Sequence, residues 1–275
     1  MKFFHVLLSI LFIGWTLNAQ TYSEWIESSF QYIDENRLDS AEIALKNALK
    51  KEPENQMNAF LFNNLGTIQR RQGKLEDALR SYTLALVRYP KNSTFLSARA
   101  SLFSETGDFK NALLDYNTLL NEYPNDEEAL YQRALLYLSI KNFELSEKDL
   151  ERIKELNPQS FYARLGFGSL YKITGRYDDA EKIYNYLEEK EPNHPAVYSG
   201  RAELFLLLKK GGKALSDINK AIRLSHEKEN PYLYIIRSKA KLLLYEKESA
   251  AEDIQKAITL GYDRESGEEL LKFAK

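Results

Sequence analysis

Histidine is the side chain of this sequence best suited to metal binding or to general acid–base catalysis near neutral pH. The chain has three, His5, His194 and His226. None has a second histidine at the spacing of a zinc site, and the segment HEKEN around His226 lacks the second histidine of a zinc-protease motif. The sequence also has no cysteine, no glycine-rich phosphate loop and no nucleophile elbow. We therefore expect no metal, no cofactor and no catalysis.

A second set of charged residues recurs at one fixed spacing. Four arginines are each followed, 16 residues later, by an aspartate: Arg99 and Asp115, Arg133 and Asp149, Arg201 and Asp217, Arg237 and Asp253. Opposite charges at a constant spacing predict a salt bridge that is built repeatedly in the same way. Independent solvated charges are the alternative.

Prolines and small residues reveal the elements that would position these charges. Proline ends helices, and Pro90, Pro124, Pro158 and Pro192 lie 34 residues apart. Counting repeats of that length, we place their first residues at Tyr22, Ala59, Ser93, Glu127, Phe161, Pro195 and Pro231. Positions 8 and 20 then hold glycine, alanine or serine in all seven repeats. Small side chains at two fixed positions allow two helices to approach closely.

One repeat shows a family pattern most clearly. In FNNLGTIQRRQGKLEDALRSYTLALVRYP, residues 62–90, a large residue, Leu-Gly, a turn glycine, alanine, tyrosine, alanine and proline follow one another. The chain thus resembles the tetratricopeptide repeat (TPR) family. The resemblance implies an all-α fold, a right-handed α-solenoid of about seven helix-turn-helix repeats. We expect one continuous solenoid domain over residues 22–264 and a capping helix over residues 265–275.

The helical hairpin of such a repeat gives the charged pairs a geometric cause. In an antiparallel pair of helices that turns at position 15, positions 7 and 23 lie at the same height. The arginines occupy position 7 and the aspartates position 23. The other three repeats hold neither residue, and have instead Ser28 with Ala44, Leu65 with Ser81, and Phe167 with Ile183. We therefore predict one salt bridge inside each of four hairpins, where it sets the register of the two helices.

The resemblance also implies a binding surface. Positions 4, 7, 8 and 11 of the first helix form the core stripe, and positions 2, 5, 9 and 12 form a second stripe about 130° from it. In proteins of this family that stripe lines a concave groove that binds extended peptides or partner helices. Its members here include Phe60, Asn63, Thr67, Arg70, Tyr131, Tyr162, Lys172, Tyr232 and Lys239. Tyrosine suits binding because it combines a large contact area with a polar group; packing of the tyrosines against neighbouring repeats is the alternative.

The first nineteen residues have the pattern of a secretory signal peptide. Lys2 precedes an apolar run, and the small residue Ala19 stands before Gln20. We expect cleavage after Ala19. An uncleaved N-terminal anchor is the alternative, because Leu17 is larger than the small residue preferred three positions before the cleavage site. No second apolar run is long enough to span a bilayer, so we expect a periplasmic or secreted protein, of bacterial origin, without a transmembrane span after cleavage.

The charge balance narrows the choice of partner. Lysine and arginine number 38 against 40 aspartates and glutamates, a net charge of −2, which gives no field that favours nucleic acid. We expect a non-catalytic scaffold that binds a partner protein or an extended peptide in its concave groove. The alternative is an accessory factor in cell-envelope assembly that binds a glycan or an envelope enzyme.

Overall fold

The structure, a computed structural model, describes residues 20–225 and 230–274. These residues form helices and the turns between them, and no strand occurs in either range. The predicted all-α class is therefore confirmed. The predicted signal peptide, His5 and His226 lie outside the described residues.

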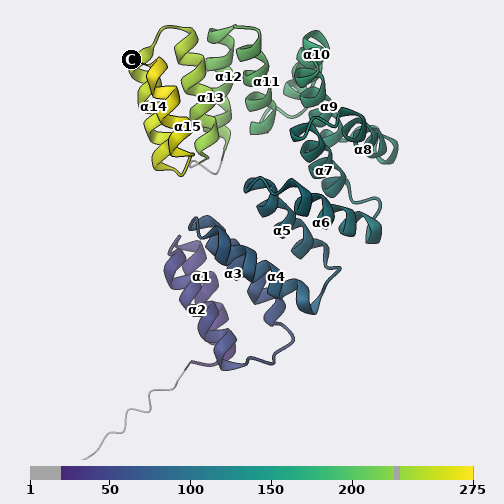
Figure 1. The fold of residues 1–275 in the computed structure, drawn as a ribbon, viewed down its shortest axis with the longest axis vertical. Coiled ribbons are helices and arrows are strands. Elements are labelled where there is room, and N and C mark those ends of the chain that lie inside the picture. The colour runs from purple at the N-terminus through teal and green to yellow at the C-terminus, as the bar shows by residue number, and fades with distance from the viewer. Residues whose placement is uncertain (1–19, 226–229, 275) are drawn as a thin grey trace, which may run out of the picture. The chain divides into compact units, whose positions relative to one another are not determined.

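Successive helices pair as antiparallel hairpins (Figure 1). Their bounds are α1 Tyr22–Asp34, α2 Leu38–Lys51, α3 Asn58–Arg71, α4 Leu75–Arg88, α5 Ser93–Glu105, α6 Phe109–Glu122, α7 Glu127–Ser139, α8 Phe143–Leu156, α9 Phe161–Ile173, α10 Tyr177–Lys190, α11 Pro195–Leu207, α12 Gly211–Leu224, α13 Pro231–Leu243, α14 Lys247–Thr259 and α15 Arg264–Phe273. The odd-numbered helices from α1 to α13 are the first helices of the seven repeats. Six of them begin at the predicted first residue, and α3 begins one residue before it, at Asn58.

The chain forms two compact units, which meet between Arg88 and Tyr89 in the sequence. The N-terminal unit contains α1 to α4, and the C-terminal unit contains α5 to α15. Each unit has a core of its own. In the N-terminal unit Leu45 and Ile68 are among the buried core residues, and Phe205 and Ala240 belong to a core cluster of the C-terminal unit.

Small residues at position 8 set the spacing within a hairpin. A Cβ added at Gly66 would lie 2.8 Å from the ring of Tyr82, and one at Gly168 would lie 3.1 Å from the ring of Tyr184. Both tyrosines are fully buried and come from position 24 of the same repeat. The second helix therefore inserts an aromatic ring where the first helix has no side chain.

The turn between the two helices of a hairpin uses the left-handed backbone conformation. At position 15, Gly73, Gly107 and Gly175 have φ angles of 75°, 79° and 81°. Glycine adopts this conformation without the steric cost that a Cβ brings. The same position has positive φ in the remaining four repeats, which place asparagine, lysine or tyrosine there.

The first helices form the inner layer of repeats 4 to 7. Helix α7 packs on α9, α9 on α11, and α11 on α13. No comparable packing joins α8, α10 and α12 to one another in the described part of the chain. The first helices of these repeats thus lie closer together than the second helices, so the first-helix side is the inner side.

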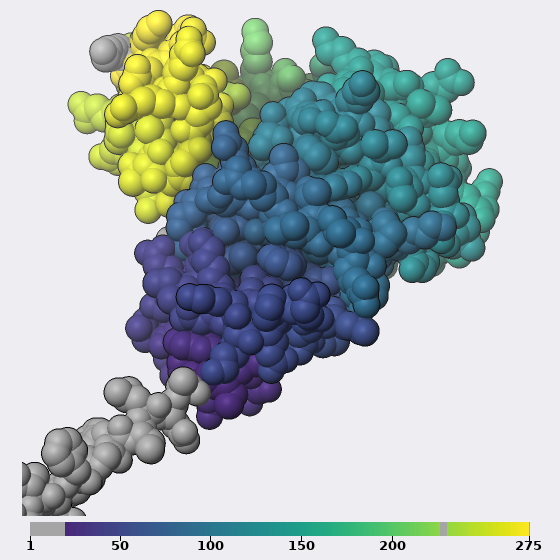
Figure 2. All heavy atoms as spheres, turned by 60° about the horizontal axis from the view of Figure 1, so that its bottom comes forward, coloured from purple at the N-terminus to yellow at the C-terminus, as the bar shows by residue number. Residues whose placement is uncertain are grey.

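Helix α15 packs against α14, the last second helix, and forms part of the yellow C-terminal surface in Figure 2. Its buried residue is Gly267, where a Cβ would lie 2.6 Å from the side chain of Ile258. A helix is therefore present at the predicted capping segment, and it begins at Arg264. Phe273 of this helix is 69% exposed, because the contact with α14 is made by the glycine side of the helix.

Candidate functional site

The structure brings each of the four Arg–Asp pairs into direct contact. In every pair the arginine Nε and Nη2 donate to the two carboxylate oxygens of the aspartate, at distances between 2.5 and 2.9 Å. All four aspartates are buried. Two parallel hydrogen bonds between planar groups fix orientation as well as distance, so each pair holds the two helices of its hairpin at one height.

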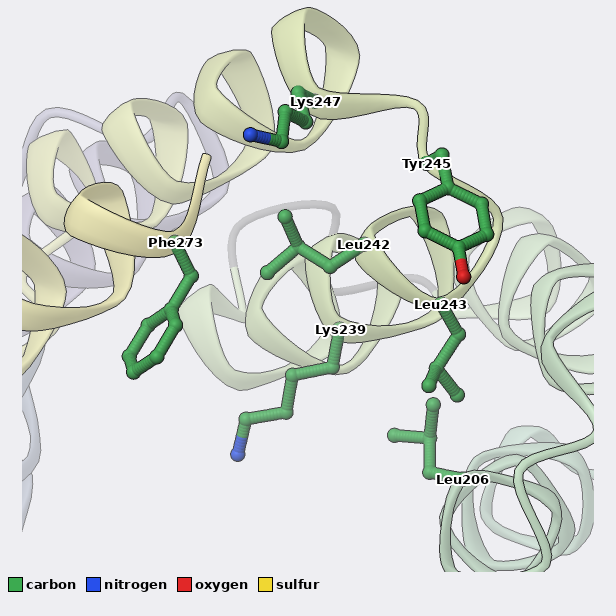
Figure 3. A pocket seen from close by; sticks show the side chains of 7 residues that line it. All are labelled: Leu206, Lys239, Leu242, Leu243, Tyr245, Lys247 and Phe273. Carbon is green, nitrogen blue, oxygen red and sulfur yellow. The ribbon is translucent and has the colours of Figure 1, made fainter. Parts of the chain in front are cut away.

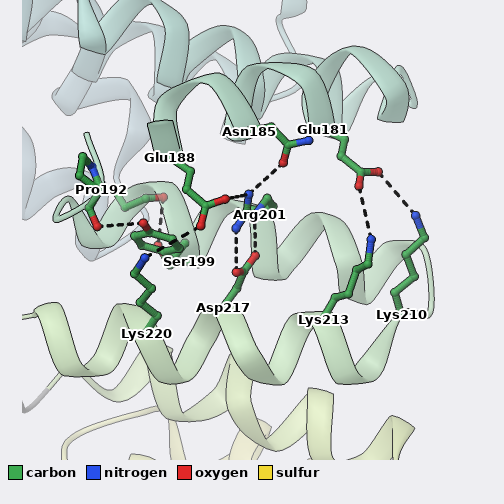
Figure 4. A network of polar contacts seen from close by, with 12 residues as sticks. Glu181, Asn185, Glu188, Pro192, Ser199, Arg201, Lys210, Lys213, Asp217 and Lys220 are labelled. Carbon is green, nitrogen blue, oxygen red and sulfur yellow. Dashed lines mark hydrogen bonds and ion pairs between the residues drawn. The ribbon is translucent and has the colours of Figure 1, made fainter. Parts of the chain in front are cut away.

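Arg201 shows that the pair also reaches outside its hairpin (Figure 4). Its Nη1 donates to Asn185 Oδ1 at 2.9 Å and to Glu188 Oε2 at 2.5 Å, and both acceptors lie on α10, in the preceding repeat. Burial disfavours the charge of Arg201, but the hydrogen bonds from Asp217 and Glu188 outweigh it and raise the pKa of the guanidinium. This arginine therefore joins three helices, α10, α11 and α12.

The asparagine in this contact recurs, and the sequence prediction missed it. Asn117, Asn185 and Asn219 all stand at position 25 of the repeat that precedes an arginine. They accept a hydrogen bond from Arg133, Arg201 and Arg237, with distances of 2.8, 2.9 and 3.4 Å. A comparison of position 7 in one repeat with position 25 in the repeat before it would have revealed the contact, because the two residue types recur together.

The two repeats of the N-terminal unit have no Arg–Asp pair at positions 7 and 23, and Glu42 joins these repeats instead. This carboxylate accepts hydrogen bonds from Gln69 at 3.2 Å and Lys74 at 2.7 Å, and forms an ion pair with Lys46. Gln69 in turn accepts from Ser81 at 2.7 Å. Burial raises the pKa of Glu42, but these donors outweigh it and lower the pKa to about 2.

On the inner side of the C-terminal unit, two residues of the predicted binding stripe lie below the surface. Tyr131 and Lys172 are each only 8% exposed. Burial favours the neutral amine of Lys172, but Tyr184 and an ion pair with Glu203 outweigh it and raise the pKa. Burial also raises the pKa of the Tyr131 hydroxyl. These side chains lie within the inner layer and offer little area to a partner.

Other members of the stripe remain accessible. Tyr232 is 51% exposed, Lys239 is exposed, and Tyr162 is half-buried with its ring 5.0 Å from that of Tyr131. The exposed inner face of the C-terminal unit thus combines aromatic rings with a basic residue.

The predicted residues of the N-terminal unit all lie on α3. Phe60 and Thr67 are exposed, and Asn63 and Arg70 are half-buried. The Thr67 hydroxyl lies 3.2 Å from that of Tyr82. One helix therefore presents all four side chains.

A pocket of about 530 Å³ opens beside Lys239 (Figure 3). Leucines of α11 and α13 and Phe273 of α15 form its apolar walls, Tyr245 of the α13–α14 turn lies at its edge, and Lys239 and Lys247 are its charged residues. Of these residues only Lys239 was predicted as a binding residue. The pocket depends on the placement of α15, which no feature of the repeat pattern specifies.

His194 has a structural role. Its Nδ1 accepts a hydrogen bond from the backbone N–H of Ala196 at 3.3 Å and so caps α11, and its ring centroid lies 4.2 Å from that of Phe161. Burial lowers the pKa of this histidine.

Within the described residues, no group of three or more histidine, aspartate and glutamate side chains is arranged to hold a metal ion. Between residues 20–225 and 230–274, no helix combines the length and apolar character needed to cross a bilayer.

Comparisons with family models, curated proteins and solved structures all point to the same family. The tetratricopeptide repeat profile matches residues 32–93, 63–127, 97–161 and 165–228. A crystal structure of a tetratricopeptide repeat protein from Parabacteroides merdae is 48% identical, covers 93% of this chain and 99% of its own, and superposes with a TM-score of 0.75.

Two further relatives are more distant. The crystal structure of yeast Tom70 covers 94% of this chain and 64% of its own with a TM-score of 0.65, at 16% identity, which shows a shared fold alone. Human tetratricopeptide repeat protein 6 is 27% identical over 84 residues, which make up 30% of this chain. The chain spans only 16% of the length of that human protein.

Proposed function

The chain belongs to the tetratricopeptide repeat family, and from that premise we propose that it is a non-catalytic scaffold that binds a partner protein or an extended peptide on its first-helix side. Proteins of this family are generally protein-interaction scaffolds. To this general role the proposal adds the surface that binds, the class of partner and the compartment in which the protein acts.

One observation carries the choice of surface. The first helices of repeats 4 to 7 form the inner layer, and Tyr162, Tyr232 and Lys239 project from it with accessible side chains. Aromatic residues are enriched in protein interfaces, since a ring contributes contact area and loses little conformational entropy on binding. Aromatic rings beside a basic residue favour a polypeptide with apolar and acidic side chains.

Site-specific photo-crosslinking tests this surface. A photoreactive phenylalanine analogue replaces Tyr232 on the inner side, and a matched control replaces Leu114, an exposed residue of the second helix α6. We expect the same protein to be captured from Tyr232 and from Tyr162 in the native compartment, and not from Leu114. Capture from Leu114 alone would place binding on the second helices and overturn the proposal.

We further propose that the protein acts after export, in a bacterial periplasm or outside the cell. The charged start, apolar run and small residue of segment 1–19 support this proposal. We expect the mass of the protein recovered from its native compartment to correspond to a chain that begins at Gln20. A recovered chain that retains residues 1–19 would contradict cleavage and indicate an anchored protein.

A further inference from the structure

The pocket formed by α11, α13 and α15 presents apolar side chains to an open space. Leu242 lies at its centre, with the ring of Phe273 on one side and that of Tyr245 on the other (Figure 3). Phe273 and Tyr245 are 69% and 88% exposed. Large exposed rings that converge on one hollow mark a binding surface more specifically than scattered apolar residues do.

Tyr245 occupies an unusual position for an aromatic residue. It stands at position 15 of its repeat with a φ of 63°, where three other repeats have glycine. A bulky side chain rarely adopts this conformation. Lys141 and Lys209 share it, with φ angles of 59° and 55°, so the backbone alone does not define a site. Tyr245 differs from them because its ring lines the pocket and, being largely exposed, adds little to the core.

The charges at the pocket point to an anionic partner. Among the residues that the structure describes, Lys239 and Lys247 are the only charged ones that line the pocket, and neither forms an ion pair with another described residue. The neighbouring Lys241, by contrast, lies 2.7 Å from Asp253 Oδ2. Lys239 and Lys247 come from different helices, α13 and α14, so a carboxylate on either side of an inserted apolar group would meet an ammonium group.

We propose that this pocket receives a bulky apolar side chain of a partner polypeptide whose neighbouring residues are aspartate or glutamate. The inference rests on the proposed function and assigns to that binding surface one subsite and one class of ligand. Leu206, Lys239 and Leu242 stand at positions 9 and 12 of the first helices, so the pocket continues the inner stripe. Its concave form suits an inserted side chain better than a planar bilayer.

Selection of peptides from a random display library on the purified protein tests the ligand class. We expect enriched peptides to carry a large apolar residue next to aspartate or glutamate. A Lys239→Glu, Lys247→Glu variant should lose affinity for these peptides by about tenfold or more, because repulsion replaces both charge contacts. Enrichment of basic peptides, undiminished affinity of the variant, or no enrichment at all would overturn the proposal.

A second pair of variants separates binding from folding. Tyr245→Gly relieves the left-handed backbone and removes the ring, so the melting temperature should rise by about 2 °C while peptide affinity falls. Lys141→Gly, the matched control, should raise the melting temperature similarly and leave affinity unchanged. Unchanged affinity of Tyr245→Gly would overturn the role of the ring.

Two further readouts identify which conclusion fails. Continued capture of a partner from Tyr232 by the Lys239→Glu, Lys247→Glu variant at the parent level would overturn the pocket and leave the inner surface intact. The second readout is binding to vesicles with equal parts of anionic and zwitterionic phospholipid. If the protein binds these vesicles and the display library yields no enriched peptide, the ligand of the pocket is a lipid surface and the proposal is overturned.

Discussion

Repeats 5 and 6 are neighbours that close their hairpins by different means. In repeat 5, Phe167 of α9 and Ile183 of α10 occupy positions 7 and 23, and Phe167 is buried. In repeat 6 the same positions hold Arg201 and Asp217, joined by two hydrogen bonds of 2.7 and 2.9 Å. A hairpin of this family thus forms with either an apolar or an ionic pair, so the charge is not required for the hairpin itself.

Repeats 5 and 6 differ in the contacts that the residue at position 7 makes with the preceding repeat. Arg201 bonds to Asn185 and Glu188 of the preceding repeat, whereas Phe167 is covered by Lys154 of its preceding repeat, 5.7 Å from the ring centroid. An arginine with five donors can serve an aspartate and a neighbour together. We conclude that the ionic hairpins of Arg133, Arg201 and Arg237 join successive repeats of the C-terminal unit.

Removal of one partner of an ionic hairpin should have the largest effect. Arg201→Leu leaves Asp217 buried without its partner and should lower the free energy of unfolding by about 3–5 kcal/mol. Glu188→Gln is the control, because Glu188 is 40% exposed and should cost under about 1 kcal/mol. Urea unfolding followed by circular dichroism measures both. If both variants lowered the free energy of unfolding by the same small amount, the Arg201–Asp217 pair would contribute little to stability.

Acid should destabilise the N-terminal unit, whose repeats are joined by Glu42. The pKa of Glu42 is lowered from its usual 4.5 to about 2, so the folded state binds the proton less readily than the unfolded state. The stabilisation is complete above pH 4.5 and is lost as the pH falls toward 2. Because solvent screens the partly exposed Lys46 and Lys74, we expect a decrease of roughly 2 kcal/mol, less than the full shift would give. A Glu42→Gln variant should lack this part of the pH dependence in urea unfolding. The same acid profile in parent and variant would contradict the role of Glu42.

Conversion of repeat 6 to the apolar form of repeat 5 should cost much less than the single change. The double variant Arg201→Phe, Asp217→Ile leaves no buried charge unpaired, so its unfolding free energy should lie within about 1.5 kcal/mol of the parent. Matched unfolding curves of the single and double variants test this. A double variant as unstable as Arg201→Leu would show that the contacts to Asn185 and Glu188 are indispensable.

The repeat architecture follows from local features of the sequence. Small residues recur in every repeat and a proline at one position in the first five. A recurring contact such as Arg201 with Asp217 likewise leaves a recurring spacing. Features that depend on one particular neighbour leave no such trace. Tyr131 and Lys172 stand in the predicted binding stripe, yet the tight packing of adjacent first helices covers them. Phe273 becomes part of a pocket only through the way in which α15 meets α14, and that contact occurs once.

The N-terminal caps of α9 and α11, in repeats 5 and 6, should give the smallest difference in stability. Ser160 caps α9 with its hydroxyl, and His194 caps α11 with Nδ1. Burial lowers the pKa of His194, so the unfolded state binds the proton more readily, and this stabilisation is lost as the pH falls below 6.5. The loss should be under about 1 kcal/mol. His194→Asn, which copies the caps Asn92 and Asn230, should remove the pH dependence; its persistence in the variant would contradict the assignment.

Thermal unfolding with and without a selected acidic peptide tests most directly the claim that paired charges build the scaffold and unpaired ones bind. A ligand that binds only the folded state raises its melting temperature. Arg201→Leu should melt lower than the parent but keep the upward shift with peptide. Lys239→Glu, Lys247→Glu should melt with the parent and show no shift. A peptide shift retained by the lysine variant, or lost by Arg201→Leu, would contradict the account.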